Sequence, residues 1–116
     1  MSDYRYGTIW LINFEPQVGT EIKKVRPGLI VSKTGFNQKR RKITVIPFTS
    51  QQKSSVGAAR VFVPKSSRNG LSKNSELITI DIATFDKKRF IKYLGELEGD
   101  LLKEAKRKLT IYLDLR

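Results

Sequence analysis

Polar and charged residues stand where predicted strands begin or end. Arg26 stands two residues before the second apolar run, residues 49–50 (Thr-Ser) follow the third, and residues 75–76 (Ser-Glu) open the fifth. Because Arg26 precedes a proline, its backbone is biased to an extended form, which leaves the side chain available to a ligand at the mouth of the strand. A guanidinium offers a planar fork of donors that matches phosphate oxygens. These residues are therefore candidates for a site that holds a phosphate-bearing ligand.

Positive charge is concentrated in the middle of the chain. The 116 residues carry 23 Lys and Arg against 11 Asp and Glu, a net charge of +12. From Ile22 to Ser75 there is no acidic residue, and this stretch of 54 residues holds 13 basic ones. Basic runs are usually solvated surface, and basicity that only aids solubility stays an alternative. The uninterrupted lack of carboxylates favours a surface kept positive for phosphates.

Cysteine and histidine are both absent from the sequence. Their absence excludes disulfides, zinc sites built on Cys or His, thiolate catalysis, Ser-His triads and paired-histidine ribonuclease chemistry. No segment approaches the roughly 18 to 20 apolar residues of a membrane span, and the first ten residues lack the layout of a signal peptide. We therefore expect a soluble, cytoplasmic protein that does not enter a membrane.

Length and apolar pattern predict a single domain over residues 1–116 that is mainly β. Continuous or alternating apolar runs predict five short strands, separated by segments rich in Gly, Ser, Asn and Lys. The runs cover residues 8–14, 28–32, 42–48, 59–63 and 75–82. Strands of this length and spacing favour a small β-barrel or a strongly bent sheet.

After Ile82 the pattern changes to a helical one. Thr84 can cap a short helical turn over residues 85–90, with Asp86 near the positive end of its dipole. From Asp100 onward, apolar residues at spacings of three and four stand opposite Lys and Arg, which predicts an amphipathic helix laid on the sheet. Its apolar positions are Leu102, Ala105, Leu109 and Tyr112 or Leu113.

Three further local features are informative. The Asn69-Gly70 pair predicts a turn, since both residues tolerate positive φ. The basic run 39–42 falls in a predicted hairpin turn before the third strand, where it is as consistent with solvated charge as with a phosphate clamp. Trp10 could stack on a base, but a lone Trp within a strand of a small barrel is more typical of the core.

Several short motifs, in their order and spacing along nearly the whole chain, resemble those of one family. They are Gly7–Trp10, Phe14–Pro16, Gly19–Glu21, Arg26–Ser32, Asn37, Ile46–Ser50, Asn69–Leu71, Thr84–Lys87 and Leu94–Leu97. With these motifs the sequence resembles the MazF/PemK toxins of bacterial type II toxin-antitoxin systems.

The resemblance implies an SH3-like small β-barrel with a C-terminal helix, in a homodimer whose interface builds an RNA groove. It also implies a sequence-selective endoribonuclease, an mRNA interferase, that cleaves single-stranded RNA without a metal or other cofactor. In that chemistry the ribose 2′-hydroxyl attacks the adjacent phosphate and leaves 2′,3′-cyclic phosphate and 5′-hydroxyl ends. The implied protein partner is a cognate antitoxin with an acidic, initially disordered segment.

The catalytic positions of the family correspond by similarity to Arg26, Thr49, Glu21 and Ser50. Arg26 is the expected stabiliser of charge on the phosphate, since a guanidinium that is always protonated makes a poor base. Thr49, supported by Ser50, is the expected hydroxyl donor to a phosphate oxygen, although Thr and Ser also end strands simply by bonding the backbone. Glu21, the carboxylate closest in sequence to Arg26, is the candidate general base.

Contacts to the RNA are expected from two long loops, residues 15–26 and 50–58. Basic side chains there suit the RNA backbone, and amides can read base edges. The RNA-binding residues that we expect are Gln17, Thr20, Lys23, Lys24, Gln51, Gln52 and Lys53.

Two other functions stay open at this point. A non-catalytic SH3-like nucleic-acid-binding domain would explain the charge and the barrel, but not the combination of Arg26, Thr49 and Glu21. A CcdB-type gyrase poison resembles this family in fold and also needs no histidine. It acts on a protein target, so it would leave the basic stretch unexplained.

Overall fold

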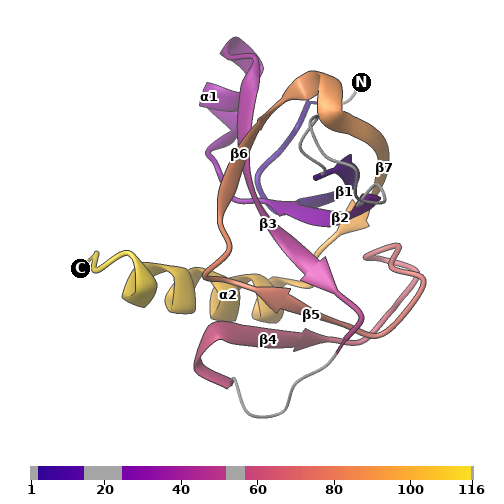
Figure 1. Ribbon diagram of the computed structural model, residues 1–116, viewed down its shortest axis with the longest axis vertical. Helices are drawn as coiled ribbons and strands as arrows, with labels where there is room; N and C mark the ends of the chain where they lie inside the picture. Colours follow the sequence, from indigo (N-terminus) through magenta and orange to yellow (C-terminus); the bar gives the residue numbers. More distant parts are fainter. Residues whose placement is uncertain (1–2, 15–24, 52–56, 116) are drawn as a thin grey trace, which may run out of the picture.

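A computed structural model of the chain describes residues 3–14, 25–51 and 57–115 (Figure 1). The sequence folds mainly into β-strands, with one short and one longer α-helix. The elements in chain order are β1 (Thr8–Asn13), β2 (Val25–Ile30), α1 (Thr34–Lys39), β3 (Lys42–Thr49), β4 (Arg60–Val63), β5 (Ser75–Ile78), β6 (Ala83–Asp86), β7 (Phe90–Glu96) and α2 (Gly99–Tyr112). Two 3-10 turns, η1 (Gly57–Ala59) and η2 (Lys87–Arg89), precede β4 and β7.

The strands pair antiparallel in the order β4-β5-β3-β2-β1-β7, and β6 also pairs with β3. Within the described residues the terminal strands β4 and β7 do not pair, so the bent sheet is not closed into a ring. Helix α2 crosses one end of the sheet and packs on β4 (Figure 1). The predicted architecture, mainly β with a C-terminal helix, is thereby confirmed, as a strongly bent open sheet rather than a closed barrel.

Strand β3 is the central strand and changes partners along its length. Residues 42–45 pair with β6, residues 45–47 pair with β2 on the other side, and residues 48–49 pair with β5. Pro47 lies in the gap between the β6 and β5 pairings, where a residue without an N–H removes no ladder bond on that side. The strand can therefore pass from one partner to the other at its proline.

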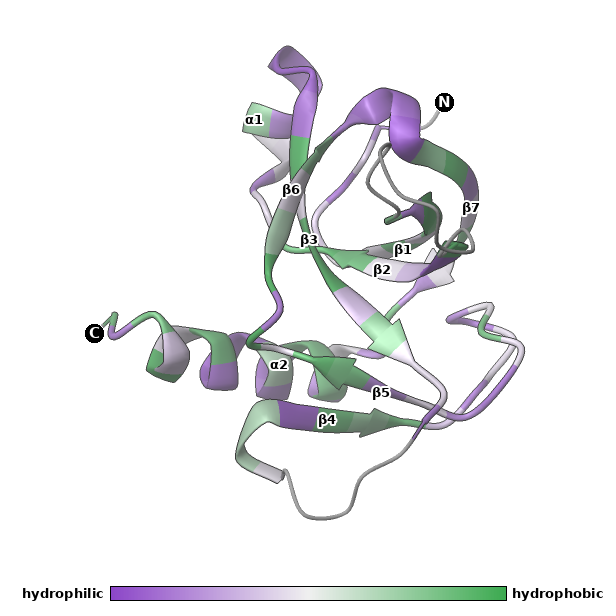
Figure 2. Cartoon of the chain, in the orientation of Figure 1, coloured by the Kyte–Doolittle hydropathy of each residue, from purple (hydrophilic) through white to green (hydrophobic). Residues whose placement is uncertain are grey.

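The core fills both faces of the bent sheet, because successive residues of a strand point to opposite faces. One cluster holds Ile9, Leu29 and Ile46, and it is covered by Leu102, Ala105 and Leu109 of α2. The other cluster holds the alternate residues Trp10, Ile30 and Val45. Figure 2 shows the apolar residues concentrated along the strands and on the face of α2 that meets them.

Trp10 belongs to this core, as predicted. Its side chain is 7% exposed, and its ring stacks on Tyr4 with a centroid separation of 4.7 Å. The indole N–H donates to the Thr8 hydroxyl at 3.1 Å, so the polar end of the ring is satisfied inside the protein.

The helical turn predicted over residues 85–90 was wrong, and the fifth strand ends at Ile78 rather than Ile82. The segment forms β6, the short turn η2 and β7. Thr84 pairs with Thr44, and their hydroxyl oxygens lie 2.8 Å apart. Tertiary pairing overrides the local helical pattern here, because residues 83–86 form the strand that pairs with the first half of β3. Asp86 does act as a cap, but only for η2, where its carboxylate accepts from the Lys88 N–H at 2.9 Å.

The hairpin turn predicted at residues 39–42 was also wrong, since α1 connects β2 to β3 and ends at Lys39. Asn37 anchors this helix with an almost fully buried side chain. Its amide nitrogen donates to the carbonyls of Tyr4 and Ser32, each at 2.9 Å, and its amide oxygen accepts from the Ser32 hydroxyl at 2.6 Å. The helix is therefore held by one amide rather than by an apolar stripe, which is why periodicity does not reveal it.

The Asn69-Gly70 turn is confirmed and acts as a structural junction. Asn69 is fully buried, and its amide oxygen accepts from the N–H groups of Ser66 and Leu71, each at 3.0 Å. Gly70 adopts a φ of +71°, and a Cβ there would lie 2.1 Å from the carbonyl oxygen of Leu94. Both the backbone conformation and the close approach of β7 therefore require glycine.

Glu98, which stands directly before α2, joins this turn to the helix. Its carboxylate accepts from the Ser66 hydroxyl at 2.6 Å and from the Asn69 amide at 3.1 Å. Burial raises the pKa of the Glu98 carboxyl, but these hydrogen bonds and nearby Arg68 outweigh burial, so the pKa lies below its ordinary value.

None of the helices in the described ranges is long and apolar enough to cross a membrane.

Replacing Gly70 by alanine is expected to destabilise the protein by roughly 3 kcal/mol, because the new methyl group adds left-handed strain and a clash with backbone. Gly35→Ala is the matched control. A Cβ at Gly35 meets nothing within 4 Å, and alanine in a helix gains about 0.5–1 kcal/mol over glycine. Urea unfolding midpoints measure both changes, and equal midpoints for the two variants would contradict the account of the turn.

Glu98→Gln is expected to cost about 1–3 kcal/mol at neutral pH, because hydrogen bonds to a charged acceptor are lost. A carboxyl whose folded pKa is lowered stabilises the protein above its ordinary pKa of 4.5, and that contribution is lost as pH falls through the lowered folded value. Urea unfolding from pH 7 to pH 3 should therefore show the gap between wild type and variant narrowing below about pH 4.5. A constant gap would argue against this linkage.

Candidate functional site

A cavity of about 440 Å³ opens where β2 begins and β3 ends, beside the start of β5. Polar side chains from three strands and two connecting segments surround it. The lining residues are Val25, Arg26, Pro27, Phe48, Thr49, Ser50, Gln51, Leu71, Ser72, Lys73 and Ser75.

Strand register explains why these residues meet. β2 and β3 run antiparallel with Gly28 opposite Pro47, so two further steps of the same register would set Arg26 beside Thr49. The pairing stops before that point, and the cavity lies between the two strand ends. β2 begins at Val25, three residues earlier than predicted, so Arg26 lies within the strand in the extended form expected before a proline.

Gly28 of β2 leaves room for two side chains that follow the course of β1. A Cβ at this position would lie 2.7 Å from Cδ1 of Ile12 and 3.2 Å from Cζ of Phe14. The Ile12 and Phe14 side chains therefore occupy the space that a larger residue at position 28 would need, and a substitution there would displace them.

Thr49 both faces the cavity and closes the turn that follows β3. Its hydroxyl oxygen accepts from the Gln51 N–H at 3.1 Å. Because a hydroxyl rotates freely, its proton is still available to a ligand oxygen. The hydrogen bond to the backbone and a donor role toward a ligand are therefore compatible at this residue.

Arg60 holds the same turn from outside the cavity. One nitrogen, Nη1, donates to the Gln51 carbonyl at 3.1 Å and to Oε1 of Glu76 at 3.0 Å. The Arg60 and Glu76 side chains are only 16% and 11% exposed. Glu76 in turn pairs with Thr49 across the β3–β5 ladder. The backbone of Gln51 is thus bonded at both its N–H and its carbonyl, which orders the end of β3.

The electrostatics of the cavity favour an anion. Arg26 and Lys73 contribute positive charge, and no carboxylate is among its described lining residues. Glu76 lies next to Thr49 in the sheet, but its charge is matched by Arg60. Among the residues with described positions, no three acidic side chains gather as a metal site requires. The arrangement can hold a phosphate through a guanidinium, an ammonium and two hydroxyls.

Ser75, a candidate from its place at a strand start, lines the cavity. Of the residues predicted for catalysis or RNA binding, four share the same cavity: Arg26, Thr49, Ser50 and Gln51. Their assigned roles in chemistry and RNA binding stay predictions. The others lie outside the described residues: Glu21, Gln17, Thr20, Lys23, Lys24, Gln52 and Lys53.

Ser72 and Lys73, which line the cavity, were not predicted from the sequence, nor was Arg60, which supports the turn after β3. The sequence holds one weak indication that Arg60 has an acidic partner, because Glu76 is the first carboxylate after the basic stretch and stands at the start of a predicted strand.

Known proteins resemble this chain both in sequence and in fold. Endoribonuclease PemK of Escherichia coli is 43% identical over 49 residues, which span 42% of this chain and 37% of that protein. A crystal structure of MazF from Deinococcus radiodurans is 27% identical, with a TM-score of 0.78 over 96% of both chains. A crystal structure of MazE-MazF from the same organism is 25% identical, with a TM-score of 0.83 over the full length of both chains.

Residues 5–113 match the family described as PemK-like, MazF-like toxin of type II toxin-antitoxin system. The match covers far more than half of the chain, so the chain belongs to this family. The resemblance read from the sequence motifs is confirmed.

Arg60→Ala is expected to destabilise the protein by about 1–3 kcal/mol, since it leaves the largely buried Glu76 carboxylate and the Gln51 carbonyl without this donor. Arg68→Ala is the matched control. Arg68 also pairs with a glutamate, Glu96, but the two side chains are 58% and 38% exposed, and such pairs contribute about 0–1 kcal/mol. Urea unfolding measures both variants, and an equal loss in each would show that burial does not distinguish the two pairs.

Proposed function

We propose that this chain is the toxin of a type II toxin-antitoxin pair and acts as a metal-independent endoribonuclease on single-stranded RNA. The observation that carries the proposal is the positive cavity that sets Arg26 close to the hydroxyl residues Thr49 and Ser50. Membership of the toxin family and the similarity to Endoribonuclease PemK of Escherichia coli support the reaction class. The active unit is a single domain over residues 1–116.

The reaction is a transesterification at phosphorus. The ribose 2′-oxygen forms a bond to the adjacent phosphorus and gives up its proton, the bond from phosphorus to the 5′-oxygen breaks, and that oxygen gains a proton. Arg26 stabilises the negative charge that grows on the non-bridging oxygens, and Thr49 and Ser50 donate hydrogen bonds to them. Glu21 is the proposed base, and the products carry 2′,3′-cyclic phosphate and 5′-hydroxyl ends.

We assign substrate selection to residues of the two long segments 15–26 and 50–58. Gln51 lines it, and we assign RNA contacts also to Gln17, Thr20, Lys23, Lys24, Gln52 and Lys53. Lys and Arg contacts to phosphate supply affinity, whereas amide contacts to unstacked bases supply sequence preference. Which sequence is cut depends on how these side chains meet the bases.

The proposed protein partner is a cognate antitoxin, and the proposed assembly is a homodimer. A related structure contains MazE together with MazF, which supports an antitoxin complex for this chain as well. An acidic segment would complement the net charge of +12 and cover the positive cavity. We place the protein in the cytoplasm, where messenger RNA is available to it.

The decisive experiment is cleavage of a long single-stranded RNA in excess EDTA, with the product ends mapped. Wild type should give discrete fragments with 5′-hydroxyl and cyclic phosphate ends. Arg26→Ala should lower kcat/KM by roughly 100- to 1000-fold, and Arg26→Lys should recover only part of this loss, because an ammonium cannot form the guanidinium fork.

Arg68→Ala is the control for charge alone, since it removes a guanidinium that does not line the cavity. It should leave the rate within a factor of about two. RNA that is bound but stays intact with wild type would instead assign a non-catalytic binding domain. No interaction with RNA at all would refute the proposal and favour a protein target.

A further inference from the structure

A second basic surface lies at the opposite end of β3 from the cavity. Two segments that are far apart in sequence form it, because Lys42 of β3 pairs with Asp86 of β6, and the Lys87 N–H donates to the Arg41 carbonyl at 2.7 Å. Figure 2 shows both segments as hydrophilic at the same end of the molecule. The distal basic surface, as we call it, comprises Lys39, Arg40, Arg41, Lys42, Lys87, Lys88 and Arg89.

Little negative charge opposes this surface. Asp86 is the acidic residue within it, and its carboxylate accepts from Arg41 at 3.1 Å. That bond does not bury Arg41, whose side chain is 80% exposed. Arg40 is exposed, and within the described ranges its side chain forms no ion pair. Lys87 lies over the Tyr4 ring, and Arg89 donates to the Asn13 carbonyl at 3.2 Å. The charge that is open to a ligand is therefore that of residues 39–42 and Lys88, which are exposed.

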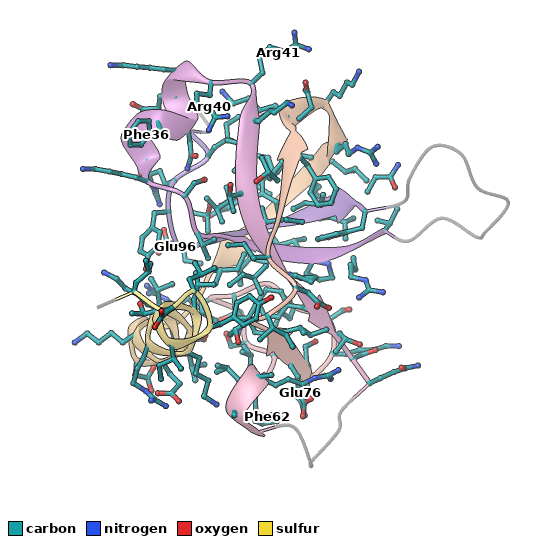
Figure 3. All side chains as sticks on the ribbon, turned by 60° about the vertical axis from the view of Figure 1, so that its left-hand side comes forward. Phe36, Arg40, Arg41, Phe62, Glu76 and Glu96 are labelled. Atoms are coloured by element: carbon teal, nitrogen blue, oxygen red, sulfur yellow. The ribbon has the colours of Figure 1, made fainter. Side chains whose placement is uncertain are left out.

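An exposed aromatic ring stands next to these charges. Phe36 of α1 is 64% exposed, and the Arg40 N–H donates to its carbonyl at 3.0 Å, so the two residues are one helical turn apart. Figure 3 shows Phe36, Arg40 and Arg41 together at one end of the molecule, with Phe62 and Glu76 at the other. A large exposed aromatic ring among cations is the combination that binds single-stranded nucleic acid, with bases on the ring and phosphates on the charges.

We propose that Phe36 and the distal basic surface bind a second segment of the single-stranded RNA substrate, outside the segment held in the cavity. A base stacks on Phe36, and the flanking phosphates contact Arg40 and Arg41. Seven strand steps of about 3.3 Å place Lys42 roughly 23 Å from Thr49, so one RNA strand can reach both sites. Binding at the second site then raises the effective concentration of RNA at the first.

This inference rests on the proposed function for the identity of the ligand, so its test separates binding from cleavage. The probes are fluorescent 2′-O-methyl oligonucleotides of 30 and 6 nucleotides, which offer no free 2′-hydroxyl and cannot be cut. Dissociation constants are measured by anisotropy for wild type, Phe36→Leu, Phe36→Tyr and Arg40→Gln. Phe62→Leu is the matched control, because Phe62 is 48% exposed on β4 at the other end of the molecule.

Phe36→Leu and Arg40→Gln should each weaken binding of the 30-mer by roughly 5- to 10-fold and leave the 6-mer unchanged. Phe36→Tyr, which keeps a ring, and Phe62→Leu should match wild type. Losing one phosphate contact in Arg40→Gln should reduce the slope of log K against log salt by about 0.7, whereas Phe36→Leu should leave that slope unchanged. Because Phe36 and Arg40 are exposed, the urea midpoints should not move.

Three results would overturn the inference. The first is equal binding of the 30-mer by all variants, and the second is an equal loss with both oligonucleotides. The third is that Phe36→Leu and Arg40→Gln weaken the binding of a glutamate-rich peptide but not the binding of RNA, which would assign the distal basic surface to a protein partner. If wild type fails to cut RNA but the variants show the expected binding pattern, the second site stands and only the nuclease proposal fails.

Discussion

The exchange of partners along β3 is the constraint on which the rest of the structure depends. One strand of eight residues pairs with β6, β2 and β5 in turn, and it can do so because Pro47 lies where the β6 and β5 pairings meet. The pairing of β2 with β3 ends at Gly28 and Pro47, and the cavity lies between the two strand ends beyond that point. At the other end the exchange holds β6 against β3 and brings two basic segments together. Both proposed RNA contacts therefore follow from one strand.

The cavity also depends on how one carboxylate is neutralised. Glu76 stands opposite Thr49 in the ladder, close to where a phosphate would bind, and an unmatched negative charge there would oppose any anion. Arg60 matches that charge and uses the same nitrogen to hold the turn after β3. One largely buried arginine thus removes a repulsion and orders the backbone beside Thr49. Arg26 and Lys73 are left as the charges that a ligand meets.

Local patterns were enough to predict the elements that local forces define. The five apolar runs contain strands, the spacing from Asp100 onward gives α2, and the Asn69-Gly70 pair gives its turn. The helical turn predicted over residues 85–90 was wrong because the strands β6 and β7 are stabilised by pairing with β3 and β1, which lie far away in the sequence. Arg26 and Thr49 could be named in advance because family motifs contain them. Arg60 could not, because its importance arises only when β4 and β5 set it against Glu76 and the Gln51 carbonyl.

The distribution of positive charge shows why a basic stretch in sequence is not yet a binding surface. Basic residues of the segment without carboxylates lie in different environments, with Arg26 and Lys73 at the cavity, Arg60 paired with Glu76 outside it, and residues 39–42 at the far end of β3. The far end then gains residues 87–89, which lie outside that segment in the sequence. Strand pairing, rather than sequence proximity, thus gathers charge at two places. A flexible polyanion such as single-stranded RNA is suited to such a surface, because it can follow positive charge from one end of β3 to the other.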